Sequence, residues 1–474
     1  MEAASLNTNC LKAEYAVRGP VPIRAELVKQ ELAKGDHSYS FDKVIPCNIG
    51  NPHALNQKPL TFVREVVSLL QAPHLLDISP SPFSAAAVQR ARAFMDKVPA
   101  GVGAYTHSQG YAHVRQEVAD FLERRDGHSA CISDIYLTDG ASAGVKMVLQ
   151  LLSSAEDPAS TGFLIPIPQY PLYSAVIALL GATAVPYYLD ESRDWAVDFE
   201  ALDQSVADAE ANGISIKAIC VINPGNPTGN LLAKTDMQRI VDLAHAKGMV
   251  IMADEVYQEN VYGEGEEFVS FKKVVRDMSS EAALVSFHSV SKGYLGECGY
   301  RGGYFELVNI PLAVRDVFYK LASIGLCPNT AGQLVVSAMV NPPDFGDEGE
   351  LFQQQKTSIL ASLKRRAGSV ATAFNSVEGM SCARVAGALY AFPSVVLPPA
   401  VEAAASAAGL ADADTLFCMR LLESTGVCVV PGSGFGQRAG THHFRMTILP
   451  EEHLIEETLR RIGEFYLSFV KQYK

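Results

Sequence analysis

The chain lacks the marks of a secreted, membrane-spanning or nucleic-acid-binding protein. Its nine cysteines include no Cys-x-x-Cys pair, so reduced thiols in a cytosol-type compartment are expected rather than a disulfide framework. No apolar run is long enough to span a bilayer, and the N-terminal segment contains no apolar signal region. The net charge of -13 argues against non-specific binding to nucleic acid, which needs a cationic surface. We therefore expect a cytoplasmic protein with no membrane or nucleic-acid partner, and leave a mitochondrial form open.

The histidines indicate no metal site. His288 and the pair His442 and His443 are the candidates, but no third ligand stands at a suitable spacing. No metal is therefore predicted. The only tryptophan, Trp195, lies between expected elements and is assigned no role.

The pattern along the chain predicts an α/β fold. At 474 residues the chain exceeds one simple core, and after an irregular arm at 1–50, interrupted by glycine and proline, amphipathic segments alternate with short apolar runs. Helices are expected at 60–71, 84–97, 140–153, 171–181, 199–211 and 235–247, and strands at 162–166, 183–189, 216–222, 249–253, 284–288 and 302–306. Such alternation is typical of a largely parallel sheet that is covered by helices on both faces.

The character of the sequence changes at residues 341–346. A helical stretch is expected at 311–338 before this point, and a long amphipathic helix at 349–376 after it. Strands near 384–396, 427–430 and 443–448 and a closing helix at 451–471 complete the chain. We expect an N-terminal arm (1–50), a large domain (51–340) and a smaller α+β domain (341–474) that the arm completes.

Three polar segments each follow a predicted strand: 223–229, 254–257 and 289–292. The carboxyl ends of parallel strands form the edge where ligands bind in open sheets. Lys292 is the candidate to hold an aldehyde cofactor as an imine and, after the substrate displaces it, to carry a proton between two carbons. Asp254 ends the apolar run 249–253, where a carboxylate is costly unless it is paired, so we expect it to face a protonated pyridine nitrogen. Tyr257 and Asn226 can hydrogen-bond the cofactor's phenolic oxygen.

The remaining polar residues predict an anion cradle and a carboxylate site. Gly140, Ala141 and Ser142 lie between a strand and a helix, where backbone N–H groups can face a phosphate. Hydroxyl and guanidinium contacts are expected from Ser289, Ser291 and Arg301, and a stacking ring from Tyr170. Arg445, on an apolar strand, is the candidate for the substrate carboxylate because arginine grips carboxylates with two donors.

These residues resemble the fold-type I aminotransferases from Gly50 to the C-terminus, and most closely the alanine aminotransferase family. The segments that carry the narrower resemblance are 15–20, 103–106, 123–127 and 289–304. The segment between Lys292 and Arg301 is one residue longer than the common pattern of the broader superfamily, and the alanine aminotransferases share this longer form.

The resemblance implies pyridoxal 5'-phosphate as the cofactor and a large domain with a sheet of the seven-stranded type. It implies the imine-forming role for Lys292, the pyridine-nitrogen role for Asp254, and phosphate contacts at Ala141, Ser142, Ser289 and Arg301. It assigns the phenolic oxygen to Asn226 and Tyr257, the stacking position to Tyr170, and the substrate carboxylate to Gly50 and Arg445. Tyr105 resembles a tyrosine that reaches the phosphate of a neighbouring subunit, which implies a homodimer. The place of Arg18 in the arm motif makes it the candidate for the second carboxylate of 2-oxoglutarate.

The expected reaction is reversible transamination of L-alanine and 2-oxoglutarate to pyruvate and L-glutamate. Glyoxylate or an aromatic keto acid stays open as the acceptor. A second class is a pyridoxal-dependent lyase of the same fold, such as an aminocyclopropane-carboxylate synthase or a carbon–sulfur lyase. A third is a non-catalytic binding module, which would have no need of Lys292, Asp254, Tyr257 and Arg445 together.

Overall fold

A large mixed sheet forms the centre of the molecule. The computed structural model describes residues 6–15, 18–35, 37–344 and 346–474, and its main sheet has the strand order β2-β9-β8-β7-β6-β3-β4-β5. The strands are β2 (Ile135–Thr138), β3 (Thr161–Ile167), β4 (Thr183–Asp190), β5 (Ala196–Val197), β6 (Ser215–Ile222), β7 (Val250–Asp254), β8 (Leu284–Ser289) and β9 (Gly303–Val308). β4, β3, β6, β7 and β8 pair in parallel, whereas β9 is antiparallel to both of its neighbours. The predicted mostly parallel sheet is confirmed, and the two-residue β5 adds an eighth strand at one edge.

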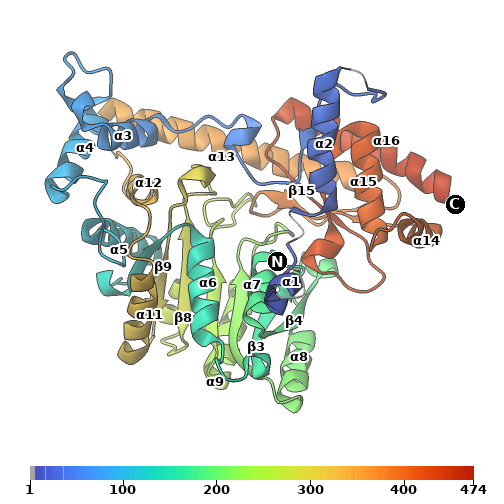
Figure 1. The fold of residues 1–474 in the computed structure, drawn as a ribbon, viewed down its shortest axis with the longest axis horizontal. Helices are drawn as coiled ribbons and strands as arrows, with labels where there is room; N and C mark the ends of the chain where they lie inside the picture. The colour runs from blue at the N-terminus through green and yellow to red at the C-terminus, as the bar shows by residue number, and fades with distance from the viewer. Residues whose placement is uncertain (1–5, 16–17, 36, 345) are drawn as a thin grey trace.

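Helices cover both faces of this sheet (Figure 1). One face packs against α6 (Ala141–Leu152), α7 (Leu172–Leu180) and α11 (Leu312–Ile324), and the other against α8 (Phe199–Ala211), α9 (Lys234–Lys247) and α10 (Phe271–Asp277). The alternation of side chains along a strand explains the two cores, because Phe163 lies in one and the next residue, Leu164, in the other. Both residues are fully buried, which is why the parallel strands read as continuous apolar runs.

A third core lies at the β2 and β9 side of the sheet. It is formed by α3 (Thr61–Gln71), α4 (Ala85–Lys97), α5 (Ala112–Asp126) and α12 (Thr330–Val340). The apolar positions of α3 recur at helical spacing and place six side chains in this core. Val290, Tyr294 and Leu295, which surround Lys292 in the sequence, pack into the same core and hold the segment that carries the lysine.

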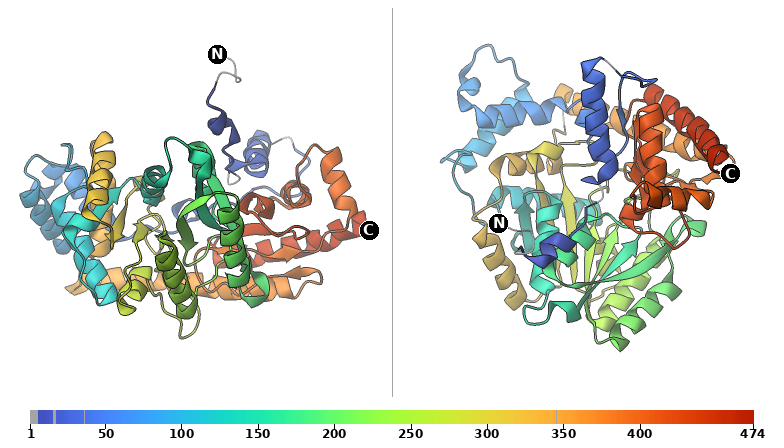
Figure 2. Two further views of the ribbon diagram at one scale, coloured as in Figure 1. Left: turned by 90° about the horizontal axis from the view of Figure 1, so that it is seen from below. Right: turned by 45° about the vertical axis from the view of Figure 1, so that its right-hand side comes forward.

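The C-terminal residues and the arm share a fourth core. It includes α2 (Pro20–Lys34), α13 (Gly346–Asn375), α14 (Ala400–Ala407), α15 (Ala413–Thr425) and α16 (Glu452–Tyr473), with α2 lying beside α15 (Figures 1 and 2). The short strands are β1 (Ile45–Pro46), β10 (Met380–Ser381), β11 (Tyr390–Ala391), β12 (Ser394–Val395), β13 (Val427–Cys428), β14 (Val430–Pro431) and β15 (Phe444–Thr447). β1 of the arm pairs in parallel with β13.

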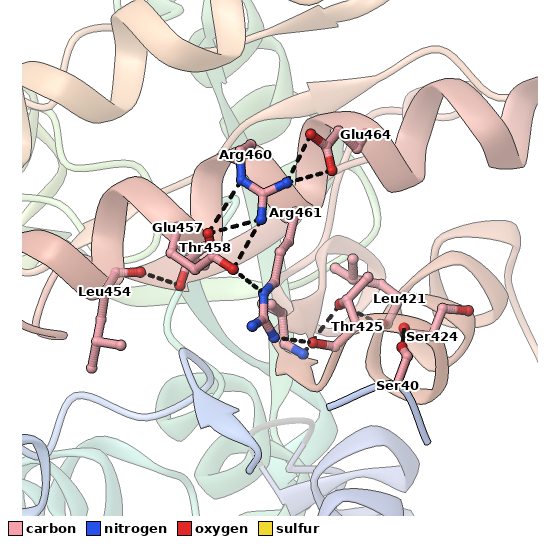
Figure 3. A network of polar contacts seen from close by, with 11 residues as sticks. Ser40, Leu421, Ser424, Thr425, Leu454, Glu457, Thr458, Arg460, Arg461 and Glu464 are labelled. Carbon is pink, nitrogen blue, oxygen red and sulfur yellow. Dashed lines mark hydrogen bonds and ion pairs between the residues drawn. The ribbon is translucent and has the colours of Figure 1, made fainter. Parts of the chain in front are cut away.

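Polar contacts join α16 to the end of α15 (Figure 3). Arg461 donates from Nε to Glu457 at 2.7 Å and from Nη1 to the carbonyl oxygen of Thr425 at 2.7 Å. The carbonyl groups at the end of a helix lack partners within the helix, so the guanidinium satisfies one of them. This contact fixes the turn that leads into β13.

Several expected elements differ from those observed. The arm was expected to be irregular, but it contains α2, a helix of 15 residues; Pro20 lies in its first turn, where proline is compatible with a helix. The stretch 311–338 forms two helices, α11 and α12. Of the strands expected at 384–396, only β11 and β12 form, with two residues each. No described helix has the length and apolar character needed to cross a membrane.

Candidate functional site

Three adjacent parallel strands bring the predicted polar residues together. β6, β7 and β8 end at the same level, since Ile222 pairs with Asp254 and Asp254 with Phe287. The loops that leave these strands carry Asn226, Tyr257 and Lys292. The Lys292 Nζ donates a hydrogen bond of 2.7 Å to the carbonyl oxygen of Gly50, so the arm reaches the lysine directly. The structure therefore places Lys292 and Gly50 in one site.

Asp254 is a buried carboxylate with hydroxyl and amide partners. It is 5% exposed, accepts a hydrogen bond from the Tyr173 hydroxyl at 3.0 Å, and accepts a longer one from the Val256 N–H. Burial raises the pKa of Asp254 to about 6, and the hydrogen bond from Tyr173 and the charge of Lys292 only partly oppose this effect. Among the described residues, no cation lies within ion-pair distance of this carboxylate. A cationic ring nitrogen would supply the missing charge.

Arg445 is a buried guanidinium that has no carboxylate partner in the described parts of the chain. It is 1% exposed and lies on β15. Its Nη1 donates to the Asn226 side-chain oxygen at 3.0 Å, its Nη2 donates to the Asn48 carbonyl oxygen at 2.7 Å, and its Nε has no hydrogen-bond partner. A buried cation without a counter-ion is costly, so an anionic ligand that it can grip with two donors is strongly favoured here.

Asn226 links this guanidinium to Tyr257. Its side-chain nitrogen lies 3.5 Å from the Tyr257 hydroxyl, while its oxygen accepts from Arg445. Both Asn226 and Tyr257 are buried, and burial raises the pKa of Tyr257 well above its usual value. Tyr257 therefore stays a protonated donor at neutral pH.

The structure brings together the residues that were predicted to form an anion cradle. The Arg301 Nη2 lies 3.3 Å from the Ser142 hydroxyl, its Nη1 lies 3.4 Å from the Ser291 hydroxyl, and Ser289 donates to Ser291 at 3.0 Å. No side chain caps the start of α6 at Gly140 and Ala141, so its first N–H groups can face a ligand. Gly140 has a φ of +78°, and a Cβ there would lie 2.4 Å from Arg301 Nη2. The cradle thus requires glycine at this position.

Tyr170 lies at the mouth of the site beneath the arm. Its hydroxyl lies 2.5 Å from the Tyr15 hydroxyl, and the two rings meet edge to face at 6.2 Å. Burial, reinforced by Tyr15, raises the pKa of Tyr170 well above its usual value. The arm therefore covers the ring that was predicted to stack on the cofactor.

Two predicted residues are not brought into this site within one chain. Tyr105 is 80% exposed. Arg18 is exposed as well, next to residues 16–17, which lie outside the described residues. The assignment of Tyr105 to a neighbouring subunit and of Arg18 to a second carboxylate both stay predictions.

The structure adds four residues that the sequence did not single out. Tyr173 donates to Asp254, Asn48 accepts from Arg445, and Tyr390 and Phe435 flank the Arg445 guanidinium, with ring centroids 4.1 Å and 4.7 Å from its Cζ. A tyrosine hydroxyl three residues after Tyr170, near the start of a mostly apolar helix, was a signal for Tyr173. No local pattern marks the other three, since tertiary packing alone brings them to Arg445.

Neither His288 nor His443 lies in a metal-binding arrangement among the described residues. His288 is 3% exposed, and burial lowers its pKa to about 3. His443 stacks on Phe392 at 4.8 Å and lies 3.1 Å from Glu191. Within the described ranges, no group of three His, Cys, Asp or Glu side chains is arranged to hold a metal ion.

The donor set fits pyridoxal phosphate. The site combines one lysine amine, a buried carboxylate with no ion-pair partner among the described residues, a phenol and amide pair, and a helix start beside hydroxyl and guanidinium groups. The amine suits the aldehyde of this cofactor, and the carboxylate suits its ring nitrogen. The phenol and amide suit its phenolic oxygen, and the helix start suits its phosphate. Arg445, whose Nε has no hydrogen-bond partner among the described residues, is then available to bind a substrate carboxylate.

Comparison with known proteins gives an independent assignment. Residues 82–462 match the family model described as aminotransferase class I and II. The chain is 47% identical to alanine aminotransferase 2 of Panicum miliaceum, covering 99% of this chain and 98% of that protein. It is 46% identical to glutamate–glyoxylate aminotransferase 1 of Arabidopsis thaliana, covering 99% and 96%. Among solved structures it resembles an alanine aminotransferase from Pyrococcus furiosus, with a TM-score of 0.77, 25% identity, and 98% and 100% of the two chains covered.

Proposed function

The chain belongs to the class I and II aminotransferase family and is a pyridoxal-phosphate enzyme, and we propose that it exchanges the amino group of L-alanine with 2-oxoglutarate. The products are pyruvate and L-glutamate, and the reaction is reversible. The observation that carries this proposal is the meeting of Lys292, Asp254 and Arg445 in one buried site. The identity to alanine aminotransferases over nearly the whole chain supports alanine as the amino donor.

The residues of the large domain would hold the cofactor. Lys292 would bond its aldehyde carbon, and Asp254 would face its ring nitrogen. Tyr257 and Asn226 would meet its phenolic oxygen. Its phosphate would be held by Gly140, Ala141, Ser142, Ser289, Ser291 and Arg301. When bound, pyridoxal phosphate supplies an electron sink that makes the substrate Cα–H acidic.

Substrate orientation is assigned to Arg445, Gly50 and Asn226. Two guanidinium donors fix the plane of the α-carboxylate, which aligns the Cα–H bond for removal by the Lys292 amine. The same amine would then hold this proton and release it on the far side of the bound amino nitrogen, so one base would serve both steps. Burial of Arg445 and Asp254 excludes water and strengthens both charge interactions.

The direct test is to incubate the purified holoenzyme with L-alanine and 2-oxoglutarate and to measure pyruvate and glutamate. Lys292→Ala is the control and should form neither product. β-Elimination or ring closure without glutamate would instead assign the chain to a lyase of the same fold. The same outcome in wild type and Lys292→Ala, with no visible absorption from bound cofactor, would favour a non-catalytic module.

A second candidate acceptor is glyoxylate. It is favoured by the 46% identity to a glutamate–glyoxylate aminotransferase, which nearly equals the identity to the alanine enzymes. Rates with 2-oxoglutarate, glyoxylate and an aromatic keto acid, each at a fixed alanine concentration, separate the candidates. A kcat/KM for glyoxylate above that for 2-oxoglutarate would replace the first assignment.

We also propose that the active unit is a homodimer. Leu312 and Ile324 of α11 are 73% and 79% exposed, and Tyr105, which is 80% exposed, lies two residues before His107, whose ring stacks on Tyr319 of α11. An apolar surface of this kind favours association with a second copy. Sedimentation of the wild-type protein should give a mass of twice 51.0 kDa, the mass of one chain. A double variant with Leu312→Asp and Ile324→Asp should give a mass closer to that of one chain.

The other proposals concern the arm, the domains and the location. Arg18 is proposed to meet the second carboxylate of 2-oxoglutarate; unchanged 2-oxoglutarate affinity in Arg18→Ala would remove this role. The division into 1–50, 51–340 and 341–474 is supported by the core that the arm shares with the C-terminal helices. The nine free cysteines support a reducing compartment, and we propose the cytoplasm, which cell fractionation tests.

A further inference from the structure

Tyr390 fills one face of the Arg445 guanidinium. It lies on β11 next to β15, is 3% exposed, and its ring centroid is 4.1 Å from the Arg445 Cζ. The Phe435 ring lies 4.7 Å from the same Cζ. Because aromatic faces attract cations, the two rings restrict how the guanidinium plane can turn. The hydrogen bonds to Asn48 and Asn226 then fix its remaining direction.

The Tyr390 hydroxyl reaches the centre of the site. A Cβ placed on Gly50 would lie 2.1 Å from the Tyr390 hydroxyl oxygen and 3.1 Å from the Lys292 Nζ, so both groups face the same small space. Tyr390 and Tyr257 meet edge to face, with their ring centroids 6.0 Å apart. A second phenol therefore lies beside the one assigned to the cofactor.

The charges around the two phenols set which one donates. Burial alone would raise the pKa of Tyr390, but the nearby Lys292 and Arg445 outweigh burial and lower it. Burial raises the pKa of Tyr257, and Tyr390 raises it further. Tyr257 is thus the poorer acid of the pair and keeps its proton, so it is the group that can donate toward Tyr390.

We propose that Tyr390 is a positioning residue with two separable roles. Its ring orients Arg445 for the substrate carboxylate, and its hydroxyl oxygen competes with the cofactor's phenolic oxygen for the proton of Tyr257. This inference rests on the proposed function of Lys292, Tyr257 and Arg445. It goes beyond that function by giving a task to a residue on β11 that packs against Tyr257 and Arg445 and faces the same space as Lys292.

Tyr390→Phe tests the hydroxyl role in the holoenzyme. With one acceptor removed, Tyr257 donates fully to the cofactor's phenolic oxygen and stabilises its negative charge. The pH midpoint of the visible cofactor absorption should then fall by roughly half a unit to one unit, the size of one net hydrogen bond. KM for alanine should stay within about twofold of wild type, since the ring remains.

Tyr390→Leu tests the ring role. Loss of a buried cation–π contact should weaken binding of propionate, a substrate-like carboxylate with no amino group, by roughly 5- to 30-fold. Competitive inhibition of the holoenzyme gives this affinity, and KM for alanine should rise by more than kcat falls. Tyr390→Phe should bind propionate as wild type does.

Tyr466→Phe is the matched control, because its hydroxyl also contacts only protein groups, the carbonyl oxygens of Gly379 and Val396. This variant should leave the pH midpoint of the visible cofactor absorption and the affinity for propionate unchanged. An unchanged or raised midpoint in Tyr390→Phe would overturn the hydroxyl role, and equal propionate affinity in Tyr390→Leu and wild type would overturn the ring role. If Tyr390→Leu does not fold, Tyr390→Met supplies the same comparison. If the visible cofactor absorption of the wild-type enzyme persists in the Lys292→Ala variant, the proposed function itself is refuted.

Discussion

Replacing Arg445 with lysine separates charge from geometry in the carboxylate site. Lysine keeps one positive charge but offers no planar pair of donors, so a bound carboxylate loses at least one charge-assisted hydrogen bond. Such a bond contributes about 1.5–3 kcal/mol, which converts to a loss of roughly 10- to 150-fold in kcat/KM for alanine. The pocket between Tyr390 and Phe435 is shaped for a flat group, so a lysine amine cannot recover this loss by moving.

The assay follows pyruvate formation over a range of alanine concentrations, with the visible cofactor spectrum as a check on the loaded site. The spectrum should be unchanged, because the Arg445 donors contact Asn226 and Asn48 and lie outside the phosphate cradle. Arg438→Lys is the matched control: this arginine pairs with Asp198 at the surface. A kcat/KM for Arg445→Lys within twofold of wild type would refute the reasoning.

Three further predictions use other parts of the site. Lys292→Ala should abolish transamination and the visible absorption of lysine-bound cofactor, and retained absorption in a spectrum would contradict the assignment. Gly50→Ala should lower kcat/KM by about tenfold or more, because its Cβ would lie 2.1 Å from the Tyr390 hydroxyl; Tyr390→Phe in the same chain should recover part of the loss. In the cofactor-free protein, urea unfolding should show stability falling by about 2 kcal/mol between pH 4 and pH 6, and Asp254→Asn should remove this fall.

The sign of the last prediction follows from proton binding. Burial raises the folded-state pKa of Asp254 to about 6 from 3.8, so between these values the folded protein holds a proton that the unfolded chain has released. The stabilisation is complete below the unfolded pKa and is lost as the pH rises through the folded one. A pH dependence identical in wild type and Asp254→Asn would show that other carboxyl groups cause it.

The sequence revealed the residues whose positions depend on local rules. Asn226, Asp254 and Lys292 each follow an apolar strand, and parallel strands must end at a common edge, so their meeting could be predicted without knowing any long-range contact. The residues proposed to hold the phosphate could also be predicted from the local sequence, since such a site requires only a strand, a glycine and a helix start. Each of these signals alone is too common to indicate a binding site, and only their joint presence predicted one.

The residues that were missed depend on contacts between distant segments. Tyr390 lies on a strand of two residues, and Phe435 in a single turn of helix, so neither carries a periodic pattern. α2 was missed for a different reason: Gly19 and Pro20 were interpreted as breaks, although a proline in the first turn of a helix costs no hydrogen bond. Tyr390 and Phe435 could not be predicted because the residues that they contact are distant in the sequence. The helix α2 could not be predicted because the position of Pro20 within a helix was not known.

The arm connects the two halves of the site. The Asn48 carbonyl accepts from Arg445 on β15, and two residues later the Gly50 carbonyl accepts from Lys292, which follows β8. Arg445 can therefore keep its orientation relative to Lys292 only while residues 48–50 hold their place. Since the arm's own position depends on α2 packing beside α15, substitutions in that remote interface should lower kcat/KM by disturbing carboxylate alignment, while leaving the phosphate cradle intact.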